Sequence, residues 1–477
     1  MFFNSLDFAI FLPIVFVLYW FVAKNNFKSQ NALIVFSSYV FYGWWDWRFL
    51  TLILFSTIID YTVGQKLRLE HAKTKRKILL WISIVVNLGF LGFFKYYNFF
   101  LDNFIDAFSL FGMEINGNSL NIILPVGISF YTFQTLSYTI DVYNKKLVPT
   151  NDFIAFSAFV SFFPQLVAGP IERATSLLPQ FYKKREFNYL KAVDGLRQIL
   201  WGLFKKIVIA DNCATYANDI FSTYSEQPGS ILLLGAIYFT FQIYGDFSGY
   251  SDIAIGTSKL FNINLKQNFA LPYFSRDIGE FWRRWHISLS TWFRDYLYIP
   301  LGGSRVSKVK QLRNTFIIFI VSGFWHGANW TFVAWGFLNA IYFIPLLLTQ
   351  NNRKHMNVVA DKTLLPTIRE FFQILFTFFL TVIAWVFFRS ETVYDALLYI
   401  ESMFSFSLFT VPTSYRSGVL YVFVLIGIEW FTRKKQHPME IDFYKVPKMI
   451  RWLIYMIFIY LILIYGGEAQ TFIYFQF

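Results

Sequence analysis

Apolar runs separated by short polar turns recur along the whole chain. The runs that approach membrane-spanning length lie near residues 6–23, 31–46, 49–63, 79–101, 120–141, 153–170, 193–212, 230–256, 315–348, 366–388, 416–432 and 447–466. A helix that crosses the hydrocarbon core needs about 20 apolar residues, so several runs are short for a full span. The pattern predicts an all-α, polytopic integral membrane protein with about 11 transmembrane helices.

Some runs are predicted to enter or line the membrane without crossing it. Run 153–170 contains two prolines and a glycine, which is typical of a re-entrant or broken helix. Residues 390–402 place acidic side chains on one side and Tyr and Leu on the other, which predicts an interfacial helix. Run 6–23 lacks the basic start and small-residue cleavage site of a signal peptide, so we expect it to be retained as the first span.

The charged turns predict the orientation of these helices. Segment 64–78 is rich in Lys and Arg, whereas segment 102–118 carries acidic residues and neither Lys nor Arg. Cytoplasmic loops of membrane proteins are enriched in basic residues, so we place 64–78 inside and 102–118 outside. Counting back three spans places the N-terminus outside. Three further basic clusters are predicted to be cytoplasmic: 183–185, 305–313 and 433–435.

Composition supports the membrane class and limits the partners. The chain has 477 residues, of which 56% are hydrophobic and 15% charged, whereas an ordinary soluble domain is about 25% charged. We attribute the net charge of +13 to membrane topology, so we expect membrane lipids and no nucleic acid as partners. Since no long polar linker interrupts the apolar runs, we predict one membrane domain over 1–477. Its predicted parts are N-terminal helices in 1–145, a motif-bearing core in 146–348 and C-terminal helices in 349–477.

Metal and thiolate chemistry are not favoured by the sequence. The chain has a single cysteine, Cys213, at the end of an apolar run, where a packed small hydrophobe is favoured over a nucleophile. His71, His355 and His437 lie in charged loops. We therefore predict neither an internal disulfide nor a metal site.

Polar side chains within apolar runs are the informative ones, because each is unfavourable in lipid without a partner or a function. In segment 242–256, Asp246 and Asp252 directly continue an apolar run. Pairing with a basic residue and a direct role in a site are equally favoured for both. Gly245 and Gly249 are spaced to allow close contact with another helix.

Segment 279–305 is too charged to face lipid. As one continuous helix it would align Trp282, His286 and Ser290 on a single face. The next turns contain Pro300 and two glycines, which would end the helix. The alternative is an interfacial anchor helix in which a backbone carbonyl satisfies His286.

Segment 315–348 contains one histidine, His326, in an otherwise apolar run. A straight helix of this length would extend about 51 Å, which exceeds one hydrocarbon thickness of about 30 Å but falls short of two. Because both flanking segments are basic, we expect the run to turn at mid-depth and to place His326 in a cavity. A buried neutral imidazole accepts a proton readily, but a core histidine held by a neighbouring helix is an equally good interpretation. Asn329 is a candidate hydrogen-bond donor.

With these segments the sequence resembles the membrane-bound O-acyltransferase family, and within it the bacterial branch of alginate O-acetyltransferases. The resemblance covers nearly the whole chain. It rests on FWRRWHISLSTWFRDYLYIPLGGSR at 281–305 and SGFWHGANWTFVAWG at 322–336, supported by FSSYVFYGWWDWRFL at 36–50, FFPQLVAGPIER at 162–173, YGDFSGYSDIAIG at 244–256 and AWVFFRS at 384–390.

The resemblance implies a helical bundle around a central cavity in a bacterial cytoplasmic membrane. It implies that His326 is catalytic and that His286 is the second histidine of the site. The candidate substrate-binding residues are Trp325, Asn329, Trp282, Ser290, Asp246 and Asp252. No cofactor is expected to be bound, and the donor would be a cytoplasmic acyl thioester, either acetyl-CoA or an acyl-carrier protein. The acceptor would be an extracytoplasmic polysaccharide or a serine of a partner acetyltransferase.

Other functions remain open at this stage. The same branch is similar to the D-alanyl transferases of teichoic acid synthesis, so the acyl group is not fixed by the motifs. A transporter of lipid-linked sugars and a scaffold of an envelope complex are the alternatives outside enzymes. A transporter would need several intramembrane charges along an aqueous path, whereas 315–348 offers one histidine.

Overall fold

The computed structural model describes residues 1–113, 117–442 and 445–475, and these residues form helices and loops without any strand. They divide into two compact units. Unit 1 comprises 1–192 with 258–266, and unit 2 comprises 193–257 with 267–477. The all-α prediction is confirmed for this part of the chain.

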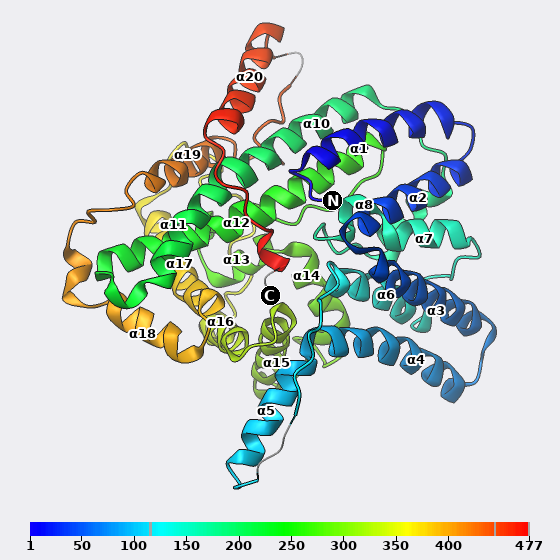
Figure 1. The fold of residues 1–477 in the computed structure, drawn as a ribbon, viewed down its shortest axis with the longest axis horizontal. Helices are drawn as coiled ribbons and strands as arrows, with labels where there is room; N and C mark the ends of the chain where they lie inside the picture. The colour runs from blue at the N-terminus through cyan, green and yellow to red at the C-terminus, as the bar shows by residue number, and fades with distance from the viewer. Residues whose placement is uncertain (114–116, 443–444, 476–477) are drawn as a thin grey trace. The chain divides into compact units, whose positions relative to one another are not determined.

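Unit 1 is built mainly from three long helices and the shorter helices that pack on them (Figure 1). Its helices are α1 (Leu6–Val17), α2 (Phe27–Asp46), α3 (Leu50–Leu69), α4 (Lys73–Leu91), α5 (Tyr97–Ser109), α6 (Ile128–Tyr143), α7 (Phe153–Ser161), α8 (Phe163–Leu166) and α9 (Ala174–Leu177). A buried polar cluster joins α3, α4 and α6, where the Asp60 carboxylate accepts hydrogen bonds from Asn87 at 2.8 Å and Thr139 at 3.0 Å. Pairing of this kind satisfies polar groups that have no access to water.

Unit 2 contains the segments singled out for chemistry. Its helices are α10 (Tyr189–Leu203, entering from unit 1), α11 (Asp211–Ser222), α12 (Gly229–Leu260), α13 (Ile278–Arg284), α14 (Ile287–Phe293), α15 (Lys308–His326), α16 (Trp330–Leu348), α17 (Ile368–Arg389), α18 (Val393–Met403), α19 (Gly418–Phe431) and α20 (Lys448–Ile464). Helix α12 lies against α10, and a Cβ atom at Gly249 would come within 2.8 Å of the Gly202 carbonyl oxygen. The predicted close helix contact at Gly249 is therefore confirmed.

The turn predicted within 315–348 is confirmed. Helices α15 and α16 form an antiparallel hairpin that turns at residues 327–329 (Figure 1). The two helices cross closely at two glycines, since a Cβ atom would overlap the Phe332 carbonyl oxygen at Gly323 and the Phe319 carbonyl oxygen at Gly336. The depth of this turn in the membrane stays a prediction.

Four helical segments in the described part of the chain are long and apolar enough to cross a membrane. They are Lys73–Ser109, Gly229–Leu260, Trp330–Leu348 and Ile368–Arg389. Shorter apolar helices occur at Leu6–Val22 and Gly418–Phe431. A protein with several membrane-spanning helices is thus supported, whereas the predicted total of about 11 spans stays a prediction.

The prediction of one continuous helix through Trp282, His286 and Ser290 is wrong. Helix α13 ends at Arg284, the Trp285 backbone is extended, and His286 adopts a left-handed conformation with φ 42° before α14 begins. Non-glycine residues rarely adopt this conformation, so the surrounding packing must hold it. The helical periodicity of 279–293 fails because Trp285 and His286 interrupt the helix, so residues before and after them no longer share one helical face.

Candidate active site

His326 is the last residue of α15, at the start of the hairpin turn. Its side chain is buried, with 3% of its surface exposed. Aromatic rings surround the imidazole, with centroid distances of 4.9 Å to Trp325, 5.2 Å to Trp335 and 5.3 Å to Phe388. Desolvation in such surroundings favours the neutral imidazole, which is the form that accepts a proton.

His286 is held by Asn268, which lies in the loop between α12 and α13. The Asn268 side-chain oxygen accepts hydrogen bonds from the Ser288 backbone N–H at 3.2 Å and the Ser288 hydroxyl at 2.9 Å. The same oxygen lies 3.1 Å from Nδ1 of His286. Because this oxygen can only accept, Nδ1 carries the proton, and Nε2 is the acceptor nitrogen of a neutral ring.

Burial also fixes the charge of His286. The ring is 1% exposed, and desolvation lowers the pKa of the His286 imidazole to about 3. The imidazole is therefore neutral at physiological pH. The alternative that a backbone carbonyl holds His286 is wrong for Nδ1, whose partner is the Asn268 side chain.

The structure brings the two histidines together around two shared aromatic rings. The Trp325 ring lies 4.9 Å from His326 and 6.0 Å from His286. The Tyr474 ring lies 5.6 Å from His326 and 6.4 Å from His286. Three segments far apart in the sequence thus meet at one place, which we name the two-histidine site: His286, Trp325, His326 and Tyr474.

Tyr474 belongs to the C-terminal tail, which we define as residues 465–475. The tail leaves α20 and returns past α12 toward α14 (Figure 1, red). It is anchored by main-chain hydrogen bonds, from the Gly467 N–H to the Ile207 carbonyl at 3.1 Å and from the Ile473 N–H to the Asp246 carboxylate at 2.7 Å. Sequence reasoning missed Tyr474 because the tail has no helical periodicity. Its run of aromatic residues after α20 was the available signal.

Asp246 and Asp252 both form ion pairs. Asp246 lies 2.9 Å from the Lys206 ammonium, and Asp252 lies 2.7 Å from the Lys205 ammonium. The interpretation of pairing with a basic residue is therefore confirmed for both. Only Asp246 also contacts the tail, through Ile473.

The remaining predicted residues lie near the site or support its walls. The Trp282 ring packs on Trp335 at 5.6 Å, and Trp335 in turn contacts His326. The Ser290 hydroxyl donates to the Trp285 carbonyl at 3.3 Å. Asn329 caps α16, since its side-chain oxygen accepts from the Thr331 N–H at 2.9 Å and its amide donates to the Glu391 carbonyl at 2.8 Å. Asn329 thus has a structural role that uses both of its polar atoms.

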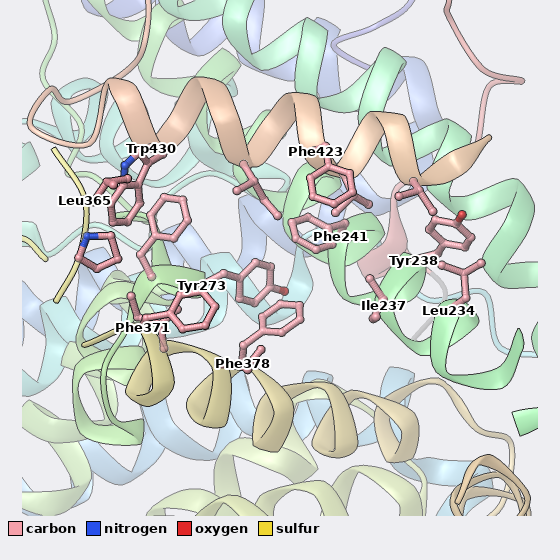
Figure 2. Close-up of a pocket in the computed structure, with 17 residues that line it drawn as sticks. Leu234, Ile237, Tyr238, Phe241, Tyr273, Leu365, Phe371, Phe378, Phe423 and Trp430 are labelled. Atoms are coloured by element: carbon pink, nitrogen blue, oxygen red, sulfur yellow. The ribbon is translucent and has the colours of Figure 1, made fainter. Parts of the chain in front are cut away.

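A large apolar cavity of about 630 Å³ lies elsewhere in unit 2, between α12, α17 and α19 (Figure 2). None of the side chains lining it is a histidine. Two of its polar atoms are already engaged, because the Tyr273 hydroxyl donates to the Thr240 carbonyl at 2.7 Å and the Trp430 indole donates to the Leu364 carbonyl at 3.0 Å. This cavity offers hydrocarbon contact without reactive groups, so we do not assign it to catalysis.

A family model and several relatives match this chain. Residues 143–388 match the family model described as MBOAT, membrane-bound O-acyltransferase family, and this range includes both histidines of the site. The chain is 40% identical over 398 residues to a probable alginate O-acetylase AlgI of Pseudomonas aeruginosa, covering 83% of this chain and 73% of the relative.

Two other relatives carry different names. A peptidoglycan O-acetyltransferase of Helicobacter pylori is 36% identical over 422 residues, covering 82% of this chain and 77% of the relative. A teichoic acid D-alanyltransferase of Streptococcus thermophilus is 31% identical over 264 residues, covering 51% and 62%. The similarity to the two acetyltransferases extends over most of both chains.

Proposed function

The chain belongs to the membrane-bound O-acyltransferase family, and on this premise we propose that it moves an acetyl group from a thioester to a hydroxyl with His326 as the general base. The observation that carries the proposal is the placement of His326, a buried imidazole at a helix end inside a cage of aromatic rings. Such surroundings keep the ring neutral and exclude water that would hydrolyse the thioester.

The proposed reaction needs one group that takes a proton from the acceptor hydroxyl and later returns it to the leaving thiolate. A ring nitrogen of His326 takes the proton from the acceptor hydroxyl while its oxygen attacks the thioester carbonyl carbon. The carbon–sulfur bond of the tetrahedral intermediate then breaks, and the imidazolium returns the proton to the leaving thiolate. The products are an ester and a free thiol, so no oxidant or metal ion is consumed.

The oxyanion of the intermediate needs a hydrogen-bond donor. Asn329 and His286 are the side-chain candidates. One of the two N–H groups of the Asn329 amide donates to the Glu391 carbonyl, and Nε2 of His286 is an acceptor in the tautomer set by Asn268. Among the described residues, the buried N–H of Gly327 forms no hydrogen bond. We propose this N–H, next to His326, as a donor; losing one such donor typically raises the barrier by about 3–4 kcal/mol.

The direction of transfer follows from the charge pattern. We propose that the donor, either acetyl-CoA or an acyl-carrier protein, reaches the site from the cytoplasm, and that the acceptor lies outside a bacterial cytoplasmic membrane. The relatives named for alginate and peptidoglycan acetylation favour a polysaccharide acceptor, reached directly or through a serine of a partner acetyltransferase. The D-alanyltransferase relative keeps D-alanyl transfer as the second candidate.

Loss of acyl transfer in His326→Ala tests the proposal. The full-length protein in lipid nanodiscs would be given radiolabelled acetyl-CoA, acetylated carrier protein or D-alanylated carrier protein, together with membranes from a strain that lacks the gene. We expect His326→Ala to abolish labelling of the polymer while insertion and thermal stability stay as in the parent. His355→Ala is the matched control, because His355 lies in a loop and contacts Asp277 instead of the site. Full labelling by His326→Ala would refute the general-base role.

A further inference from the structure

The C-terminal tail is bound to unit 2 by its backbone as well as its side chains. Phe472 and Ile473 are buried, with 2% and 1% of their surfaces exposed. The ring of Phe472 packs on Tyr250 at 4.7 Å, and the ring of Tyr474 packs on Phe247 at 4.3 Å. The tail is therefore an ordered part of the wall of the two-histidine site, although its described residues form no α-helix.

One buried ammonium group joins the tail to two carboxylates. Nζ of Lys206 lies 2.8 Å from Asp211 and 2.9 Å from Asp246, and it donates a hydrogen bond to the Gln470 carbonyl at 3.0 Å. An ammonium has three N–H donors, and these three oxygens match them in number. The positive charge is thus shared between helix side chains and the main chain of the tail.

Asp246 also binds the tail, because its two carboxylate oxygens have different partners. Its Oδ1 pairs with Lys206, and its Oδ2 accepts the Ile473 N–H at 2.7 Å. The Lys206–Asp246 pair therefore binds one carbonyl and one N–H of the tail, three residues apart. Phe247, the next residue on α12, contacts Tyr474 and also His286, at 4.7 Å.

We call the Lys206–Asp246 pair, with its hydrogen bonds to the main chain of the tail, the latch. Hydrogen bonds to charged groups are stronger than neutral ones, and in a buried site they are not weakened by water. A buried charge that loses its partner is strongly unfavourable, so the ion pair and the bound tail stabilise each other. The neighbouring Lys205–Asp252 pair has the same composition, but no tail contact is found for it among the described residues.

We propose that Lys206 and Asp246 are positioning residues that latch the C-terminal tail, so that Tyr474 is held against both histidines and the acyl-transfer site is closed on that side. The link to acyl transfer rests on the proposed function, whereas the latch itself does not. Without the latch, the tail leaves the two-histidine site and the reacting groups lose one wall. The rate of the chemical step then falls.

Cysteine accessibility tests the latch directly. In a Cys213→Ala background, Ile473→Cys places the single thiol at the buried tail position. The rate of maleimide labelling would be measured in nanodiscs for this parent and with Lys206→Met or Asp246→Asn added. Since each change removes a charge-assisted contact, we expect labelling to accelerate about tenfold or more. Asp246→Asn keeps the side-chain volume, and Lys206→Arg, which keeps the charge, should restore at least part of the protection.

Lys205→Met is the matched control, because it breaks the neighbouring Lys–Asp pair, whose side chains are 3% and 16% exposed and for which the described residues show no tail contact. It should leave the labelling rate within about twofold of the parent, which separates tail release from general loosening of a buried pair. Equal labelling rates in the parent, Lys206→Met and Asp246→Asn would overturn the latch, as would equal acceleration by Lys205→Met.

Kinetics test the catalytic consequence in the Cys213→Ala background with Ile473 intact. We expect Lys206→Met and Asp246→Asn to lower kcat about tenfold, with the KM for the donor within about threefold, because positioning acts on the chemical step. An accelerated labelling rate with unchanged kcat would overturn the positioning role. If His326→Ala keeps full activity while the latch variants still expose the thiol introduced by Ile473→Cys, the proposed function fails and the latch stands.

Discussion

The Tyr474 ring packs against the imidazole of His326, with 5.6 Å between the ring centroids. The other rings around His326 are those of Trp325, Trp335 and Phe388. Among these four aromatic neighbours, only Tyr474 carries a hydroxyl. The tail therefore supplies one wall of the cage around the proposed base, through a ring that carries a hydroxyl.

Tyr474→Phe separates the contribution of the ring from that of the hydroxyl. Phenylalanine keeps the ring and its contacts with Phe247 and His326, so stability should change little. A role of the hydroxyl in proton transfer predicts that kcat falls by about a hundredfold, within the range known for such groups, whereas a role in packing alone predicts little change. Single-turnover acyl transfer would measure this effect. Phe472→Tyr is the control, since it adds a hydroxyl to the tail without altering the ring at His326. Activity of Tyr474→Phe equal to that of the parent would limit Tyr474 to packing.

The sequence predicted those parts of the site that lie on regular helices. The apolar run around His326, its glycines and its basic flanks predicted the α15–α16 hairpin, because helix length and loop charge are local properties. For Asp246 the sequence left pairing with a basic residue and a site role equally open, because its partner Lys206 lies 40 positions away and sequence periodicity does not reveal it.

The two errors arise where the chain departs from regular α-helix. Helical spacing aligned Trp282, His286 and Ser290, but the left-handed conformation of His286 breaks the helix. That conformation is stabilised by tertiary contacts such as the one with Asn268, which propensity does not include. Tyr474 was missed for a similar reason, since it lies in a single short 3-10 turn, Ile473–Phe475, and the position of this turn depends on Lys206 and Asp246.

Changing Asn268 should alter the pH dependence of the reaction. The Asn268 oxygen holds Nδ1–H of His286, whose pKa is lowered to about 3 by burial. Asn268→Asp would place a carboxylate beside the ring and favour the imidazolium, so the pKa of His286 should rise. A group with a raised pKa gains its proton as pH falls toward that value. If neutral His286 is needed, acyl transfer by Asn268→Asp should therefore fall at mildly acidic pH, where the parent stays active.

A pH–rate profile between pH 5 and 8 would measure this difference, within the range where imidazoles titrate. Asn268→Ala is the control, because it removes the oxygen without adding a charge. It should lower activity about tenfold at every pH, because the hydrogen bonds of the Asn268 oxygen to Ser288 and His286 are lost and the tautomer is no longer fixed. If the pH–rate profiles of Asn268→Asp and the parent have the same shape, the reaction does not depend on a neutral His286.

The glycine crossing of the α15–α16 hairpin predicts a stability effect. A Cβ atom at Gly336 would overlap the Phe319 carbonyl, which belongs to the facing backbone and has little freedom to move. Gly336→Ala should therefore destabilise the protein by about 1–3 kcal/mol, as overpacking typically does. Gly427→Ala is the matched control, because that glycine lies within α19 and a Cβ atom added there would meet nothing within 4 Å. It should be neutral or slightly stabilising, since Ala is the better helix former. Thermal unfolding in detergent would compare the two, and equal midpoints would contradict the close crossing.

The hairpin also predicts the topology of its ends. Helix α15 begins at Lys308 and α16 ends at Leu348, so Arg313, near the start of α15, and Lys354, just after α16, lie at the same end of an antiparallel pair. In a Cys213→Ala background, Arg313→Cys and Lys354→Cys should both react with a membrane-impermeant maleimide in inverted vesicles and not in intact cells, because basic flanks face the cytoplasm. Asn103→Cys, in the acidic segment 102–118, should show the opposite pattern and thereby report on the orientation of the N-terminal helices.

Labelling of positions 313 and 354 from opposite sides would mean that α15 and α16 together cross the bilayer once. His326 would then lie at a bend in a single span, and the base would have to be approached through the lipid.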